Sequence, residues 1–219
     1  MRRNPSDYTA RSTFQVQRLS LQSFNEVRAF CEPMPKFCDV VGSREPVVDA
    51  SLGLFCSERC PGDLIVSACD VAIALREAHV PVISGFHSPV ERECLRILLR
   101  GRQPIMISPA RSLHGMRVPP GWRDPIREGR LLVISPFAAK YSRITAALAA
   151  QRNEFIAALA RAILIIYADL GGTVEALARR ILRQGKPLFT FDHLSNQNLV
   201  AAGARAVNAS DIVAAWKAM

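Results

Sequence analysis

The 219-residue sequence lacks an apolar run long enough to cross a bilayer, which takes about 20 residues. Its longest apolar stretches, residues 157–160 and 162–168, are separated by Arg161. Polar residues follow Arg2 and Arg3, where a signal peptide needs an apolar segment. We therefore expect no membrane partner and a cytoplasmic location.

The six cysteines include no C-x-x-C pair, so we expect them to behave as small buried hydrophobic residues. A zinc site built on Cys56 and Cys60 is the alternative. The histidines are scattered, and we expect no metal and no cofactor. A Walker motif and the G-x-G-x-x-G fingerprint are also missing, which argues against ordinary NTPases and dinucleotide dehydrogenases.

Lysine is scarce, because only four of the 28 basic residues are lysines and the rest are arginines. With 19 acidic residues, the formal net charge is +9. Arginine binds phosphate oxygens in a bidentate manner and stacks on bases, so this composition favours nucleic acid or nucleotide phosphates as partners. A basic surface without a specific partner is the alternative.

The remaining composition, 49% hydrophobic and 21% charged, is typical of a soluble chain with a substantial core. Short apolar runs predict strands near residues 38–41, 80–84, 104–108, 131–135, 162–168, 187–191 and 205–207. Helical patterns lie between them, near residues 47–60, 63–78, 89–100, 144–159, 174–184, 197–202 and 211–217. This alternation predicts an α/β fold with a doubly wound, mostly parallel sheet and helices on both faces.

Two segments differ from this pattern. Residues 1–36 are polar and Arg-rich, and we interpret them as an N-terminal arm or short helical extension before one domain at 37–219. Residues 110–130 are rich in Gly and Pro and predict a long irregular connection, a type of segment that is usually functional in a compact domain.

Three turns rich in Gly, Ser, Thr and Arg follow predicted strands, at residues 41–44, 84–88 and 171–175. The second leads into a well-specified helix start, with Ser88 as cap, Pro89 at the first position and Glu91 completing a capping box. Because doubly wound folds bind ligands at the carboxyl ends of their strands, we expect these turns to form one anion site. The candidate ligands are Gly42, Ser43, Arg44, Ser84, Gly85, Gly171, Gly172 and Thr173.

A series of short motifs accompanies these elements in a definite order. It comprises V-G-S-R at 41–44, S-G at 84–85, R-N at 152–153 with a small-residue run at 156–159, G-G-T at 171–173, N-L-V-A-A-G-A at 198–204 and D-I-V at 211–213. In this order and spacing the chain resembles the DNA-processing protein A (DprA/Smf) family, whose central domain is Rossmann-like and belongs to the SLOG superfamily. The resemblance implies single-stranded DNA binding, a homodimer and, for full-length members, recombinase loading in DNA-mediated transformation.

The resemblance also implies roles for individual residues. Arg44 would reach a phosphate beside the amides of the same turn, unless it pairs with a nearby carboxylate. Arg111, Arg117 and Trp122 would contact the strand from the long connection, although Trp122 alternatively covers the edge of the core. Arg152 and Asn153 would be either ligand contacts or a buried polar clasp.

The chain also departs from the family. Phe86-His87-Ser88 stands where the usual turn continues with Gly-Ile-Asp. We also expect no C-terminal winged-helix domain after Met219. We expect a minimal member that binds single-stranded DNA without catalysis. The alternatives are a nucleotide-binding SLOG sensor, a phosphoribohydrolase-like enzyme using Glu175 or His87, or a domain that makes only protein contacts.

Overall fold

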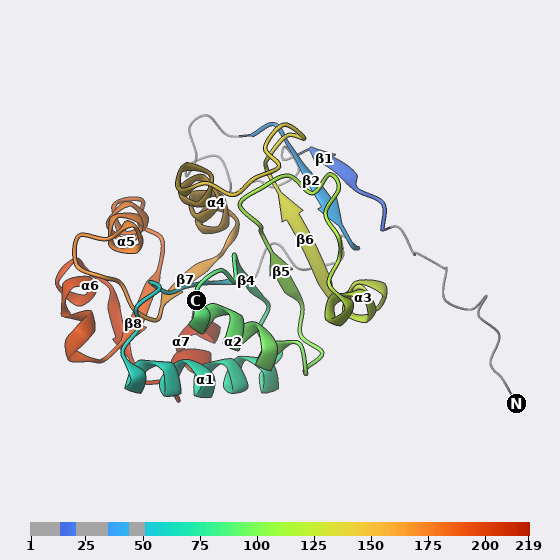
Figure 1. Ribbon diagram of the computed structural model, residues 1–219. Helices are drawn as coiled ribbons and strands as arrows, with labels where there is room; N and C mark the ends of the chain where they lie inside the picture. Colours follow the sequence, from blue (N-terminus) through green and yellow to red (C-terminus); the bar gives the residue numbers. More distant parts are fainter. Residues whose placement is uncertain (1–13, 21–34, 44–50) are drawn as a thin grey trace, which may run out of the picture.

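The fold is built on one sheet with strand order β1-β2-β6-β5-β4-β3-β7-β8-β9, and a computed structural model describes residues 14–20, 35–43 and 51–219 of the chain (Figure 1). Strands β3 to β9 all run parallel to one another. At one side of the sheet, β2 runs antiparallel to both of its neighbours, β1 and β6. The strands are β1 Gln17–Ser20, β2 Phe37–Val41, β3 Leu52–Phe55, β4 Val82–Ser84, β5 Ile105–Ile107, β6 Leu131–Ser135, β7 Ala162–Ile165, β8 Leu188–Phe191 and β9 Arg205–Val207. The predicted α/β class with a mostly parallel sheet is confirmed.

Helices cover both faces of this sheet because its strands are apolar on both sides. In β3, Leu54 packs into one core cluster with α1 and α2, and the adjacent Phe55 packs into the other with α4 and α5. These two pairs of helices lie on opposite faces of the sheet (Figure 1). No helix in the described ranges is both long and apolar enough to span a membrane. The helices are α1 Gly62–Glu77, α2 Pro89–Leu98, α3 Pro120–Arg127, α4 Ala146–Leu159, α5 Thr173–Arg183, α6 Gln197–Ala201 and α7 Ile212–Lys217.

The centre of the sheet differs from the sequence prediction. A helix was predicted at 47–60, but residues 52–55 form β3, which pairs in parallel with β4 and β7. Part of the reason is Gly53, because a Cβ there would lie 2.5 Å from Cδ1 of Ile163 and 3.1 Å from Cβ of Ala160, so the missing side chain makes room for the neighbouring strand. The prediction is wrong in its described part, and residues 44–50 lie outside the described residues.

The chain reverses its direction of travel across the sheet at β3. From β3 it moves through β4 and β5 to β6, and α4 then returns it to β7 on the other side of β3. The boundary between β3 and β7 is therefore the topological switch point, where open α/β sheets bind ligands beyond the carboxyl ends of their strands.

Strand β1 and helix α3 are additions to the predicted elements, whereas β2 matches the strand predicted near 38–41. β1 lies in the segment interpreted as an arm and pairs antiparallel with β2. Helix α3 occupies part of the connection predicted to be irregular, and that part of the prediction is wrong. Trp122 in its first turn packs half-buried against the core.

Candidate phosphate-binding pocket

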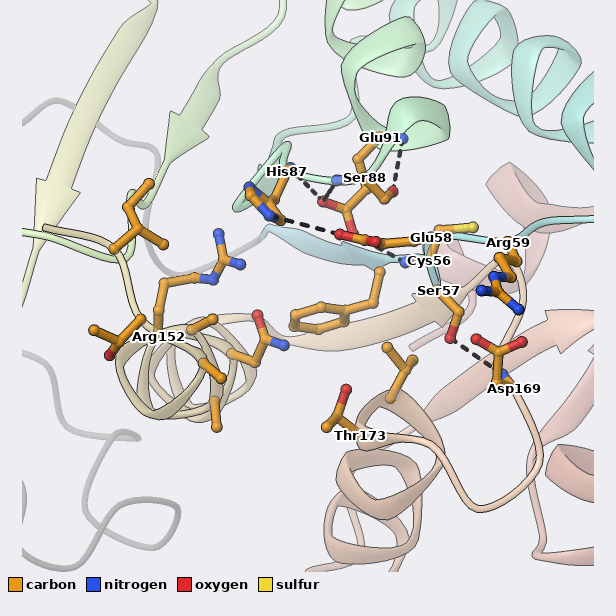
Figure 2. A pocket seen from close by; sticks show the side chains of 18 residues that line it. Cys56, Ser57, Glu58, Arg59, His87, Ser88, Glu91, Arg152, Asp169 and Thr173 are labelled. Carbon is orange, nitrogen blue, oxygen red and sulfur yellow. Dashed lines mark hydrogen bonds and ion pairs between the residues drawn. The ribbon is translucent and has the colours of Figure 1, made fainter.

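A pocket of about 600 Å³ lies at the topological switch point, over the carboxyl ends of β3 and β7. Its walls are the turns after β3 and β4 and the first turns of α4 and α5 (Figure 2). The lining residues are Phe55, Cys56, Ser57, Glu58, Arg59, His87, Ser88, Glu91, Ile144, Thr145, Ala146, Ala149, Ala150, Arg152, Asn153, Asp169, Thr173 and Val174.

The amino ends of three helices, α2, α4 and α5, meet at this pocket. The side chain of Ser88 caps α2 and that of Thr145 caps α4. Helix α5 begins after Gly172, which has no side chain to bind the first amides. Because each helix carries a partial positive charge and unpaired N–H groups at its amino end, the pocket favours an anion.

Arg152 is the cation built most deeply into the pocket. It comes from α4, is only 5% exposed, and donates from Nη1 to the carbonyl oxygen of Ser108 at 3.2 Å. Its Nε has no hydrogen-bond partner among the described residues. Burial lowers the pKa of Arg152, and the nearby Glu91 opposes that shift. Figure 2 shows the side chain reaching from α4 toward the turn that carries His87.

The Glu91 carboxylate joins the turns after β3 and β4. It accepts backbone N–H groups from Cys56 at 3.0 Å, from His87 at 2.7 Å and from Ser88 at 3.4 Å. Burial raises the pKa of Glu91, and these N–H groups act in the opposite direction. Since this carboxylate is engaged with the backbone, we assign Glu91 a positioning role.

The turn after β3 contributes both a hydroxyl and a charged side chain. The Oγ of Ser57 accepts the amide of Asp169 at 3.1 Å, which ties this turn to the one after β7. Arg59 is exposed at the pocket, and Glu58 lies 3.8 Å from Nε2 of His87. The sequence prediction missed Ser57 and Arg59; the available signal was the apolar run 52–55 ending in Cys-Ser-Glu-Arg before the Pro61-Gly62 helix start.

The predicted turn at 42–43 does not reach this pocket. Because β2 runs antiparallel to β6, Gly42 lies beside Leu131 at the amino end of β6, the opposite edge of the sheet. Its φ of +118° and the backbone oxygen of Leu131, 2.6 Å from a would-be Cβ, both require glycine. The prediction that Gly42 and Ser43 share a site with Gly171 is therefore wrong. Arg44 lies outside the described residues.

The other predicted residues separate into two groups. Arg152, Asn153 and Thr173 line the pocket. Ser84, Gly85, Gly171 and Gly172 are not among its lining residues, although Gly85 lies against the guanidinium of Arg152 and the two other glycines form the turn before α5. Arg111, Arg117 and Trp122 are not among its lining residues.

Glu175 is engaged within its own turn, although it was considered as a catalytic candidate. Its carboxylate accepts the Gly171 amide at 2.5 Å and pairs with Arg179 at 3.0 Å. The Gly171 amide is the main cause of the lowered pKa of Glu175. Glu175 does not line the pocket, whereas His87 does.

The described cysteines are all free thiols. Cys56 lines the pocket, and its thiol hydrogen bond to Cys60 raises the pKa of Cys56 and lowers that of Cys60. Among the described residues, no group of three or more His, Cys, Asp or Glu side chains could hold a metal ion.

Comparison with known proteins identifies similar chains. A family model described as DNA recombination-mediator protein A matches residues 31–217. Among solved structures, DNA processing protein A from Helicobacter pylori, studied for its single-stranded DNA binding mode, superimposes with a TM-score of 0.74 at 19% identity, covering 94% of this chain and 98% of that one. DNA processing protein A from Streptococcus pneumoniae gives 0.72 at 14% identity, covering 91% and 74%. A molybdenum cofactor binding protein from Rippkaea orientalis gives 0.54 at 14% identity, covering 79% and 98%. Curated proteins gave no match.

Proposed function

The chain belongs to the DNA recombination-mediator protein A family and is a DNA-processing protein, and from that premise we propose that it binds single-stranded DNA in the pocket between β3 and β7. The observation that carries this proposal is the buried guanidinium of Arg152. An arginine with an unpartnered Nε, buried where three helix amino ends meet, is prepared for a phosphate. The Helicobacter pylori relative, whose single-stranded DNA binding was studied, supports the same ligand class.

The charges in the pocket are compatible with a polyanion. The Glu91 carboxylate accepts hydrogen bonds from three backbone N–H groups, and the Glu58 carboxylate lies beside His87. The Arg59 side chain and the remaining N–H groups of Arg152, whose Nη1 donates to Ser108, can therefore bind phosphate oxygens together with the amides at the start of α5. Binding would be non-enzymatic, with affinity that comes mostly from phosphate contacts.

A free nucleotide is the second candidate ligand. The Glu58–His87 pair faces the pocket, and about 600 Å³ is ample for one nucleotide. A sensor or phosphoribohydrolase-like enzyme of the SLOG type would use such a pocket. Homodimerisation and a recombinase partner stay predictions from the family resemblance.

A fluorescence anisotropy titration with labelled oligo-dT, competed by a panel of nucleoside mono- and diphosphates, tests this assignment. We expect the oligonucleotide to bind to the wild type. The Arg152→Lys and Asn153→Ala variants should bind it more weakly. For Arg152→Lys a loss of about 1.5–3 kcal/mol corresponds to the loss of a charge-assisted hydrogen bond.

The matched pair for this titration is Arg59→Ala, at the pocket, and Arg123→Ala, an exposed arginine on α3. Only the first should weaken binding. A different result would assign the pocket to a free nucleotide in place of DNA. In that result a mononucleotide displaces the oligonucleotide at equal or lower concentration, and Arg59→Ala weakens binding of the nucleotide but not of the oligonucleotide.

A further inference from the structure

A second cavity, of about 230 Å³, lies against the β1–β2 hairpin. Because β2 runs antiparallel to β6, Asp39 in the middle of β2 is paired with Ser135 at the carboxyl end of β6. The hairpin cavity therefore opens at the same sheet edge as the phosphate-binding pocket. Its lining residues are Arg18, Lys36, Phe37, Asp39, Ser135, Pro136, Phe137 and Ala138.

Phe37 is the unusual residue of this cavity. It begins β2, in which the following four residues are buried, yet its own side chain is 53% exposed. Two cationic side chains, Lys36 and Arg18, line the cavity with it. An exposed aromatic ring among cations is typical of proteins that stack the bases of single strands and neutralise their phosphates.

Arg18 is held in position by a buried carboxylate. Its Nε and Nη2 donate to the two oxygens of Asp39 at 2.9 and 3.4 Å. Asp39 is also 3.1 Å from Nε2 of His114, which comes from the connection after β5. With both contacts, Asp39 fixes the guanidinium at the cavity before any ligand arrives, and this reduces the entropy lost on binding.

One loop joins the two cavities. Residues 136–138 line the hairpin cavity, while Ile144 and Thr145 of the same loop line the phosphate-binding pocket. Between them Tyr141 is 39% exposed, and Nζ of Lys140 lies 5.1 Å from the centre of its ring. The loop thus carries an aromatic side chain and a cation along the path from one cavity to the other.

We infer that the hairpin cavity is a second subsite for the same nucleic acid strand, an inference that rests on the proposed function. One base stacks on Phe37, and Arg18 and Lys36 bind the adjacent phosphates. Four strand spacings separate β3 from β2, or about 20 Å at about 4.8 Å each. A strand toward the upper end of the usual range of about 4–16 nucleotides per site therefore spans both cavities.

A length series of oligo-dT tests the subsite with Phe37→Ala. An oligonucleotide of about 4 nucleotides fills the pocket alone, and one of about 16 reaches both cavities. We expect Phe37→Ala to bind the short one as wild type does and the long one about tenfold more weakly, within the range for loss of one stacking aromatic. Phe37→Trp should restore the long-strand affinity, because the indole ring also stacks.

The matched control is Val66→Ala, which removes a similarly exposed apolar side chain from α1. The hairpin subsite is overturned and the pocket stands if Phe37→Ala binds oligo-dT of every length as wild type does, while Arg59→Ala binds every length more weakly. If Phe37→Ala weakens long strands while Arg59→Ala and Arg152→Lys change nothing, the pocket is overturned and the subsite stands. A wild type that binds no single strand of any length refutes both.

Discussion

The guanidinium of Arg152 occupies the space in which a side chain at Gly85 would stand: a Cβ at Gly85 would lie 1.5 Å from Nη1. Gly85 follows β4, and its lack of a side chain lets a cation from α4 lie against the backbone and reach the carbonyl of Ser108. The S-G turn after β4 is therefore paired with the arginine of the R-N motif.

Gly85→Ala should displace the Arg152 side chain and break its hydrogen bond to Ser108. We expect a loss of about 1–3 kcal/mol in the free energy of unfolding, because a buried charged group loses its partner. Single-stranded DNA should bind more weakly as well. Urea denaturation and anisotropy measure the two effects.

Gly121→Ala is the control, because a Cβ at Gly121 in α3 meets nothing within 4 Å. It should leave stability unchanged or raise it by up to about 1 kcal/mol, since alanine favours helix over glycine. Equal stability and binding in Gly85→Ala and wild type would contradict the role given to this contact.

The start of α2 was predictable because every signal for it is local. Ser88, Pro89 and Glu91 form the predicted capping box, with both of its hydrogen bonds present. Most of the parallel strands were predictable for a related reason, because short apolar runs have Pro or Gly beside them: Pro136 follows 131–135, and Pro187 precedes 188–191.

The antiparallel direction of β2 and the order of the strands could not be predicted, because both depend on pairing between distant segments. V-G-S-R at 41–44 follows an apolar strand and resembles the family turn, but β2 runs antiparallel and ends at the opposite edge. The turn after the first parallel strand is instead Cys56-Ser57-Glu58-Arg59, preceded by only four strand residues. A run this short has no periodicity that separates a buried strand from a helix.

Binding of single-stranded DNA should depend steeply on salt. Each phosphate that is neutralised releases counterions and contributes about 0.7 to the slope of log affinity against log salt, so several contacts give a slope of several units. Arg59→Ala should reduce the slope by about 0.7. A flat response in titrations between low and physiological salt would refute the phosphate contacts.

The pKa of Glu175 is lowered mainly by the Gly171 amide and further by Arg179. A carboxylate with a lowered folded-state pKa stabilises the protein above its unfolded pKa, about 4.3, and loses this effect as the pH falls through the folded value. Glu175→Gln should therefore be less stable than wild type at pH 7, and the difference should shrink below about pH 4. Urea midpoints at both pH values measure it, and a difference that grows at low pH would be the wrong sign.

Thiol reactivity should follow the hydrogen bond between Cys56 and Cys60. That bond lowers the pKa of Cys60, whereas burial raises the pKa of Cys94. Since the thiolate is the nucleophile, iodoacetamide should label Cys60 before Cys56 or Cys94 in the folded protein. Peptide mass spectrometry over time measures the order, and Cys60→Ser should remove the fast phase. Rapid labelling of Cys94 would show that its burial is not maintained in solution.

Glycosidic cleavage of a nucleotide is the activity that would overturn a purely binding role. A hydrolase acting on a ribose needs a carboxylate free to reach the sugar, but both oxygens of Glu175 are engaged, one by Gly171 and the other by Arg179. That charge is explained by the amino end of α5, an interaction worth about 0.3–1 kcal/mol. We expect wild type and Glu175→Ala to release no free base from nucleoside monophosphates, as followed by chromatography. Release by wild type that Glu175→Ala abolishes, with both proteins folded by circular dichroism, would mean that this carboxylate leaves its turn during a reaction, and DNA binding would then be secondary to catalysis.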